Sequence, residues 1–281
     1  MPQRIVGDGF IRKVIFKAAR KKRKIFCFAE RGEIKGGIKE VERINKVGKL
    51  HVISTLADGE GIRKVRDFLS LLVTGFAKQV SVYMNETWEA PFVFRERQLH
   101  TFLAPTLSKF TDVFLMEAPV HRKWSSISSQ DYNDSHGWVD YWCFYRNLVF
   151  LIELKHGFLS GRTGTPNKNV KNYWVEAVQQ LDVIQDYADI QSQDSGGAFR
   201  IALQVLPIYE TVNDSMPKII GNTDKLLEIQ KNCMEAFKPE PNWSMLWQLH
   251  ESITGPFEYA NTKEFYPGIV FLSRVSEIHK G

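Results

Sequence analysis

The chain has 281 residues, of which 43% are hydrophobic and 25% charged, and its formal net charge is +5. This is the composition of a folded globular protein, and no apolar run approaches the ~20 residues that a membrane helix requires. Three widely spaced cysteines, Cys27, Cys143 and Cys233, suit neither a disulfide framework nor a zinc cluster. The N-terminus lacks the apolar core of a secretory signal, so we expect a cytoplasmic protein that does not enter a membrane.

The charge is distributed unevenly along the chain. Residues 1–50 contain 15 Lys and Arg against 5 Asp and Glu, whereas the remaining residues contain 22 against 27. Residues 10–24 combine an apolar helical face with basic faces, which is typical of a nucleic-acid-contacting arm or of a solvated basic helix. The asymmetry favours a polyanionic partner, and nucleic acid is the candidate.

Residues 1–85 are interpreted as a basic N-terminal region. Short strands are predicted at 25–29 and 50–55, and a long amphipathic helix from Asp58 to about Tyr83. The sequence contains no Gly-x-x-x-x-Gly-Lys-Ser/Thr element, which argues against a Walker-type nucleotide site.

Residues 86–281 are predicted to form one α/β unit followed by a C-terminal appendage. The patterns predict a helix at 95–110, a strand at 111–120, a loop at 121–136, two strands within 137–157, a loop at 157–169, a helix at 170–190 and a strand at 199–209. In the appendage they predict helices at 223–237 and 243–253 and a strand at 268–275. We therefore expect a mixed sheet flanked by helices.

The two strands within residues 137–157 carry the main chemical clue. If their turn is centred on residues 146–147, opposed positions sum to 293 and Asp140 faces Glu153. Strand side chains alternate between faces, so Lys155 shares the face of Glu153. Charged groups in an otherwise apolar strand are costly unless they are paired or bind a metal.

These residues suit metal-assisted hydrolysis of a phosphodiester bond. Asp140 and Glu153 are oxygen ligands of the kind that Mg²⁺ takes from proteins, and the backbone carbonyl of Leu154 is a further candidate ligand. Lys155 would orient the attacking water or stabilise charge on the phosphate. The alternative is a solvated cross-strand ladder of ion pairs, but the same faces carry several large apolar residues.

Glu96 lies on the side of its predicted helix that also carries Leu99 and Leu103. A glutamate at a helix start commonly complements the helix dipole. Its functional interpretation is a carboxylate directed at whatever the helix packs against, and both interpretations stay open at this point.

The pattern resembles the PD-(D/E)xK nuclease superfamily. Val139-Asp140 stands where that family has Pro-Asp, and Glu153-Leu154-Lys155 matches its Glu-x-Lys. The predicted element order over residues 95–209 is similar to the family's helix–strand–strand–strand–helix–strand core. The resemblance implies a restriction-endonuclease-like core with helices on both faces of the sheet, and N-terminal and C-terminal extensions around it.

The resemblance also implies further site residues and an activity. The family's first helix often carries a glutamate near the metal, which falls on Glu96, as a further catalytic residue and metal ligand. Its second helix often carries a glutamine or a basic residue, which falls on Gln180, with Gln179 and Lys171 as alternatives. The implied activity is that of an endo- or exodeoxyribonuclease dependent on Mg²⁺ or Mn²⁺, with DNA favoured over RNA, and a homodimer is left open.

A non-catalytic module that binds nucleic acid or protein while keeping a nuclease-like fold is the alternative function. The intact set of two carboxylates and a lysine argues against it, since a binder does not need to retain all three.

Overall fold

The computed structural model describes residues 39–44, 47–59, 61–124, 133–184, 196–212, 217–259 and 262–278. The helix expected at 10–24 and the strand expected at 25–29 lie outside the described residues. The helical elements are α1 (Ile62–Thr87), η1 (Pro91–Val93), α2 (Glu96–Phe110), α3 (Lys168–Asp182), α4 (Thr223–Ala236) and η2 (Glu251–Ile253). The strands are β1 (Lys39–Ile44), β2 (Gly48–Ser54), β3 (Val113–Trp124), β4 (Asn133–Tyr145), β5 (Leu148–His156), β6 (Leu159–Ser160), β7 (Ala198–Val212), β8 (Trp243–Leu249), β9 (Phe257–Tyr259) and β10 (Thr262–Ile278).

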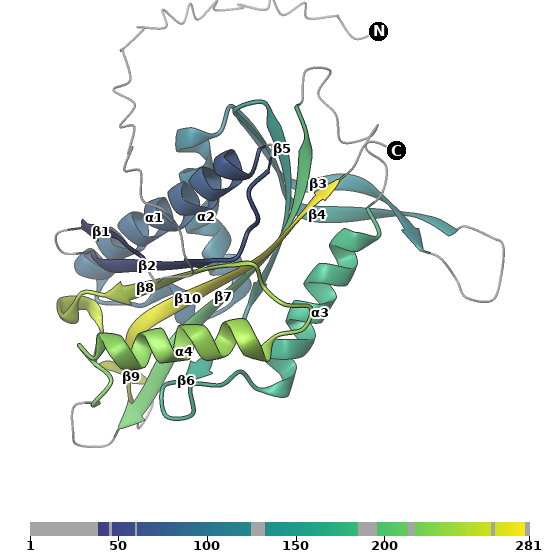
Figure 1. The fold of residues 1–281 in the computed structure, drawn as a ribbon. Coiled ribbons are helices and arrows are strands. Elements are labelled where there is room, and N and C mark those ends of the chain that lie inside the picture. Colours follow the sequence, from purple (N-terminus) through teal and green to yellow (C-terminus); the bar gives the residue numbers. More distant parts are fainter. Residues whose placement is uncertain are drawn as a thin grey trace, which may run out of the picture. The chain divides into compact units, whose positions relative to one another are not determined.

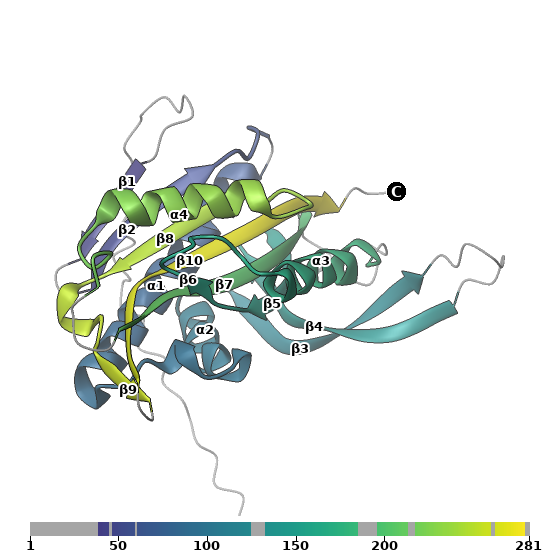
Figure 2. The same ribbon diagram turned by 90° about the horizontal axis from the view of Figure 1, so that it is seen from below.

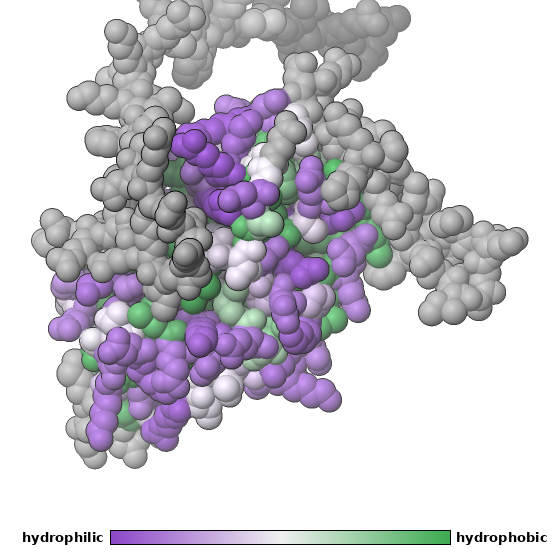
Figure 3. All heavy atoms as spheres, in the orientation of Figure 1, coloured by the Kyte–Doolittle hydropathy of each residue, from purple (hydrophilic) through white to green (hydrophobic). Residues whose placement is uncertain are grey.

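The described strands form one mixed sheet in the order β1-β2-β8-β10-β7-β5-β4-β3, with β6 beside β7 and β9 beside β10. Helices α1 and α2 cover one face and α3 and α4 cover the other (Figures 1 and 2). Each face therefore has its own apolar core, and the expectation of a mixed α/β sheet with helices on both faces is confirmed. On the side seen in Figure 3, hydrophilic residues cover most of the described surface, including the outer side of α4.

The β4–β5 hairpin has the register that the sequence predicts. Tyr141 pairs with Ile152 and Phe144 with Val149, and both pairs sum to 293. The turn residues at 146 and 147 have φ of 48° and 68°, the left-handed conformations that a two-residue type I′ hairpin turn requires. The turn thereby places Asp140 and Glu153 at opposed positions of neighbouring strands, just beyond the last pair of the β4–β5 ladder.

The order α2, β3, β4, β5, α3, β7 follows the predicted order. β5 and β7 pair in parallel, and α3 lies in the connection between them, as a parallel pair requires. The predicted helix at 95–110 coincides with α2, the helix predicted at 223–237 with α4, and the strand predicted at 199–209 lies within β7.

Two local predictions are wrong in part or in full. Residues 121–136 were expected to be a loop, but β3 continues to Trp124 and β4 begins at Asn133. Residues 243–253 were expected to be a helix, but 243–249 form β8, in which all seven residues are buried between β2 and β10. A short apolar run of this kind fits a fully buried strand as well as a helix, because neither leaves a polar face.

The part of the expected N-terminal region that the structure describes shares its sheet and core with residues beyond 85. β2 pairs along its length with β8, and α1 contributes buried residues from Val65 to Met84 to the same core as α2 and β5. β2 and β8 lie far apart in the sequence, and no local sequence pattern predicts that two such strands pair. None of the helices in the described part of the chain is long and apolar enough to span a membrane.

Phe68 of α1 tests whether this helix is integral to the sheet that carries the hairpin. Its ring is fully buried and stacks on Phe150 of β5, with ring centroids 4.2 Å apart. We expect Phe68→Ala to lower the free energy of unfolding by about 3–5 kcal/mol, because it removes contacts and leaves a cavity. Leu71→Ala, at a residue 41% exposed on the same helix, should cost less than about 1 kcal/mol. Equal losses in urea unfolding of the two variants would contradict this packing.

Candidate active site

The candidate site begins where the β4–β5 ladder ends. Tyr141 and Ile152 are the last pair of the ladder, and Asp140 and Glu153 occupy the next positions. The Asp140 carboxylate accepts the backbone N–H of Leu154 through Oδ2 at 2.7 Å. This bond ties Asp140 to β5 and holds its carboxylate beside the Glu153–Lys155 segment.

The β3–β4 ladder is also interrupted at Asp140. Pairing passes from Met116 and Tyr141 to Ala118 and Val139, and Glu117 and Asp140 between them are not paired. Glu117 has φ of 48°, an uncommon conformation for a residue with a side chain. Backbone strain of this kind clusters at functional sites, where the surrounding structure maintains it.

Glu153 and Lys155 share one face of β5, as the alternation predicts. Lys155 Nζ lies 2.8 Å from Glu153 Oε1, and the two side chains are 15% and 7% exposed. Burial on its own would lower the pKa of Lys155, but the carboxylates of Glu153, Glu96 and Asp140 outweigh burial and raise it. The ammonium therefore stays charged within a group of carboxylates.

Glu96 is brought to the same place by α2. It is the first residue of that helix and lines a pocket together with Lys155. Burial raises the pKa of its carboxyl, and the negative charge of Asp140 raises it further. Lys155 and a hydrogen bond from the backbone of His156 oppose this shift without cancelling it. The functional interpretation of Glu96, a carboxylate directed into the site, is the one that the geometry favours.

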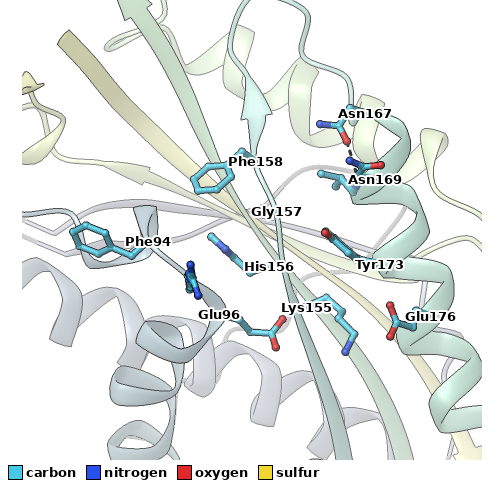
Figure 4. Close-up of a pocket in the computed structure, with 12 residues that line it drawn as sticks. Phe94, Glu96, Lys155, His156, Gly157, Phe158, Asn167, Asn169, Tyr173 and Glu176 are labelled. Atoms are coloured by element: carbon cyan, nitrogen blue, oxygen red, sulfur yellow. Dashed lines mark hydrogen bonds between the residues drawn. The ribbon is translucent and has the colours of Figure 1, made fainter. Parts of the chain in front are cut away.

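The pocket is an open cavity of about 560 Å³ between α2, the end of β5 and the start of α3. It is lined by Phe94, Arg95, Glu96, Lys155, His156, Gly157, Phe158, Asn167, Asn169, Val170, Tyr173 and Glu176. Figure 4 shows Glu96, Lys155 and Glu176 gathered at one end of it. Three secondary-structure elements thus meet at one charged patch.

The second helix contributes a different residue from the one expected. Glu176 of α3 lines the pocket, whereas Gln180, Gln179 and Lys171 do not. Gln180 lies one turn further along and donates from Nε2 to Glu176 Oε1 at 3.3 Å. Gln180 therefore contacts a residue of the pocket wall without lining the pocket itself. The i, i+4 spacing of this pair was a signal in the sequence that could have identified Glu176.

Two histidines lie beside the carboxylates and were not predicted as site residues. His100, one turn after Glu96 on α2, is 2.6 Å from the hydroxyl of Tyr141 through Nδ1. His156 lines the pocket, and its Nε2 is 2.9 Å from the carbonyl oxygen of Phe92. Burial lowers the pKa of both imidazoles, in His156 to about 4, so His156 is neutral at pH 7 and donates to that carbonyl.

The donor set has the chemistry of a site for a hard divalent cation. Asp140, Glu153 and Glu96 supply carboxylate oxygens, and one lysine balances them only in part. Within the described ranges, however, no group of three or more His, Cys, Asp or Glu side chains is placed closely enough to hold a metal ion. The residues present fit Mg²⁺ or Mn²⁺ by ligand type but not by their spacing in this structure, in which Lys155 contacts one oxygen of Glu153.

No protein-family model, curated protein or solved structure matches this chain. The assignment of the site consequently depends on the arrangement of its own residues.

The raised pKa of Glu96 has a consequence for stability. The folded-state pKa lies above the ordinary value of 4.5, so ionisation of Glu96 opposes folding at neutral pH. We expect Glu96→Gln to be more stable than the unchanged protein at pH 7. The gain should shrink as the pH falls through the folded-state pKa and disappear below about 4.5, where Glu96 is protonated in both states.

Urea unfolding followed from pH 7 down to pH 4 measures this difference. Glu86→Gln, at an exposed position on α1, is the matched control and should follow the unchanged protein at every pH. A gain in Glu96→Gln that stays constant across the range would show that the effect does not come from ionisation.

Proposed function

We propose that the chain is a metal-dependent nuclease that hydrolyses phosphodiester bonds of DNA. The observation that carries the proposal is the clustering of charge around Lys155: the carboxylates of Glu153, Glu96 and Asp140, from β5, α2 and β4, all act on its ammonium, and Lys155 and Glu96 line the open pocket. The pattern resembles the PD-(D/E)xK superfamily, and the order α2, β3, β4, β5, α3, β7 supports a restriction-endonuclease-like core.

The chain's own residues have distinct roles in this proposal. Asp140 and Glu153 would hold Mg²⁺ or Mn²⁺, with the carbonyl oxygen of Leu154 and the carboxylate of Glu96 as further candidate ligands. When bound, such a cation neutralises charge on the phosphate and lowers the pKa of a coordinated water. Lys155 donates a hydrogen bond to the attacking water or to a phosphate oxygen, and its raised pKa keeps the ammonium charged for this task.

The hydrogen bond between Asp140 and Leu154 positions the first of these ligands. It occupies Oδ2 of Asp140. The bond fixes the rotamer of the carboxylate before a cation binds, which lowers the cost of assembling the site. Gln180 has the same kind of role toward Glu176, at the opposite wall of the pocket.

Cleavage of linear and supercoiled DNA by the purified protein with Mg²⁺ or Mn²⁺ tests the proposal. We expect Asp140→Asn and Lys155→Met each to reduce the rate at least about a hundredfold. Asparagine retains an oxygen that accepts the Leu154 N–H, so Asp140→Asn should keep the fold and lose only the charge. Lys109→Met, at an exposed position near the end of α2, is the control and should cleave normally.

Cleavage that persists undiminished in Asp140→Asn or Lys155→Met would overturn the assignment, as would cleavage that continues at the same rate in EDTA. Thermal unfolding of each variant separates loss of activity from loss of fold.

One observation favours the alternative, a binding module without catalysis: Lys155 is in direct contact with Glu153 and partly neutralises it. Calorimetric titration with Mn²⁺ distinguishes the two. A nuclease should show a binding site that disappears in Glu153→Gln, whereas a binder should give the same trace for both proteins. Circular dichroism of Glu153→Gln confirms that the variant is folded.

A further inference from the structure

The pocket has a second end whose chemistry differs from that of the carboxylates. Beyond Glu96, Lys155 and Glu176, its wall includes the rings of Phe94, Phe158 and Tyr173 and the amides of two asparagines. Figure 4 shows Phe94 and Tyr173 on opposite sides of the pocket, with Phe158 and the two asparagines at the end away from Glu96. Metal-assisted hydrolysis does not need this end, so it calls for an explanation of its own.

The aromatic rings at this end are unusually accessible. Phe94 is 50% exposed and Tyr173 is 45% exposed, although the described chain buries most of its large aromatic side chains. Phe158 is fixed in the wall by an edge-on contact with His156, with centroids 4.8 Å apart, and by another with Tyr209. Accessible rings on two sides of a cavity form a surface on which a flat ligand can stack.

Polar groups beside the rings complement a nucleotide. The amides of Asn167 and Asn169 line the same end, and asparagine amides pair with the edges of bases. Asn167 Oδ1 accepts the N–H of Val170 at 3.0 Å and caps α3, which fixes this side chain at the pocket wall. Arg95 adds a positive charge to the lining that suits a phosphate group.

The dimensions restrict what can occupy this end. A cavity of about 560 Å³ lies in the range of small-ligand sites, ~300–1,000 Å³, and so accommodates one nucleotide with its phosphate, not a duplex. Bases in a duplex have their faces covered by their neighbours, so only an unpaired base can stack on Phe94 or Tyr173. Glu96, Lys155 and Glu176 lie at the other end of the same pocket.

We propose that the aromatic end of the pocket binds an unpaired nucleotide, so that the substrate of this site is single-stranded DNA or a single-stranded end. The inference rests on the proposed nuclease function, and it specifies the substrate class of that site. Stacking on Tyr173 and Phe94 holds the base, the asparagine amides contact its edge, and the next phosphate lies beside Glu96 and Lys155.

Binding of a single-stranded DNA oligonucleotide containing 2-aminopurine tests this proposal. The measurement is made in EDTA, so that no cleavage occurs, and at about 0.2 M salt, where contacts based on charge alone are weakened. We expect the single strand to bind more tightly than the same sequence in a duplex and its fluorescence to be quenched by stacking. Tyr173→Ala and Phe94→Ala should each weaken single-strand binding about tenfold and relieve the quenching.

Two further variants control for loss of fold and for exposed aromatics in general. Tyr173→Phe keeps the ring and should bind and quench as the unchanged protein does. Trp88→Ala removes an aromatic side chain that is 79% exposed and lies outside the pocket, and it should leave binding unchanged. Equal affinity for duplex and single strand, or equal behaviour of Tyr173→Ala and Trp88→Ala, would overturn the proposal.

The outcomes separate this proposal from the nuclease assignment. Single-strand binding that depends on Tyr173, in a protein that never cleaves DNA with Mg²⁺ or Mn²⁺, would support the pocket and refute the nuclease. Cleavage that depends on Asp140, with no effect of Tyr173→Ala or Phe94→Ala on binding, would support the nuclease and refute the pocket.

Discussion

The hydrogen bond from the Leu154 N–H to the Asp140 carboxylate is the interaction on which the rest of the site depends. It lies where β4 stops pairing with β5, and it replaces a backbone contact of the sheet with a side-chain contact. Asp140 is therefore held by the strand that carries Glu153 and Lys155. A small relative movement of the two strands would alter this contact and the charge cluster together, so the order of the sheet and the geometry of the site are coupled.

That coupling extends to strands far from the hairpin. β5 is held on its other side by β7, β7 by β10, and β10 by β8, which in turn pairs with β2. The sheet that carries the site thus draws its strands from both halves of the chain. A topology with so many non-local strand pairs folds more slowly than one built from local contacts. Chain entropy is lost when distant segments come together, before their pairing stabilises the sheet.

The sequence predicted the part of the structure that depends on local pattern. The turn at residues 146–147 set the hairpin register, and the alternation of side chains placed Glu153 and Lys155 on one face. It did not predict β8, because a fully buried strand has no polar face to mark it, nor the pairing of β2 with β8. Glu176 and the aromatic wall were missed because residues from three elements form the pocket only after the sheet has closed. Gln180, inferred from resemblance alone, lies one turn away from the pocket lining.

The two-residue turn between β4 and β5 also limits how this chain can vary. Both of its residues have left-handed conformations, and their position sets which residues of β4 and β5 face each other. Since side chains alternate with a period of two, one inserted residue would move the partner of Asp140 to the opposite face of the sheet. A substitution within the hairpin leaves this register unchanged, whereas a change in the number of residues between the aspartate and the glutamate shifts it. The spacing of thirteen positions between residues 140 and 153 is in this sense a stricter marker of the site than its local sequence.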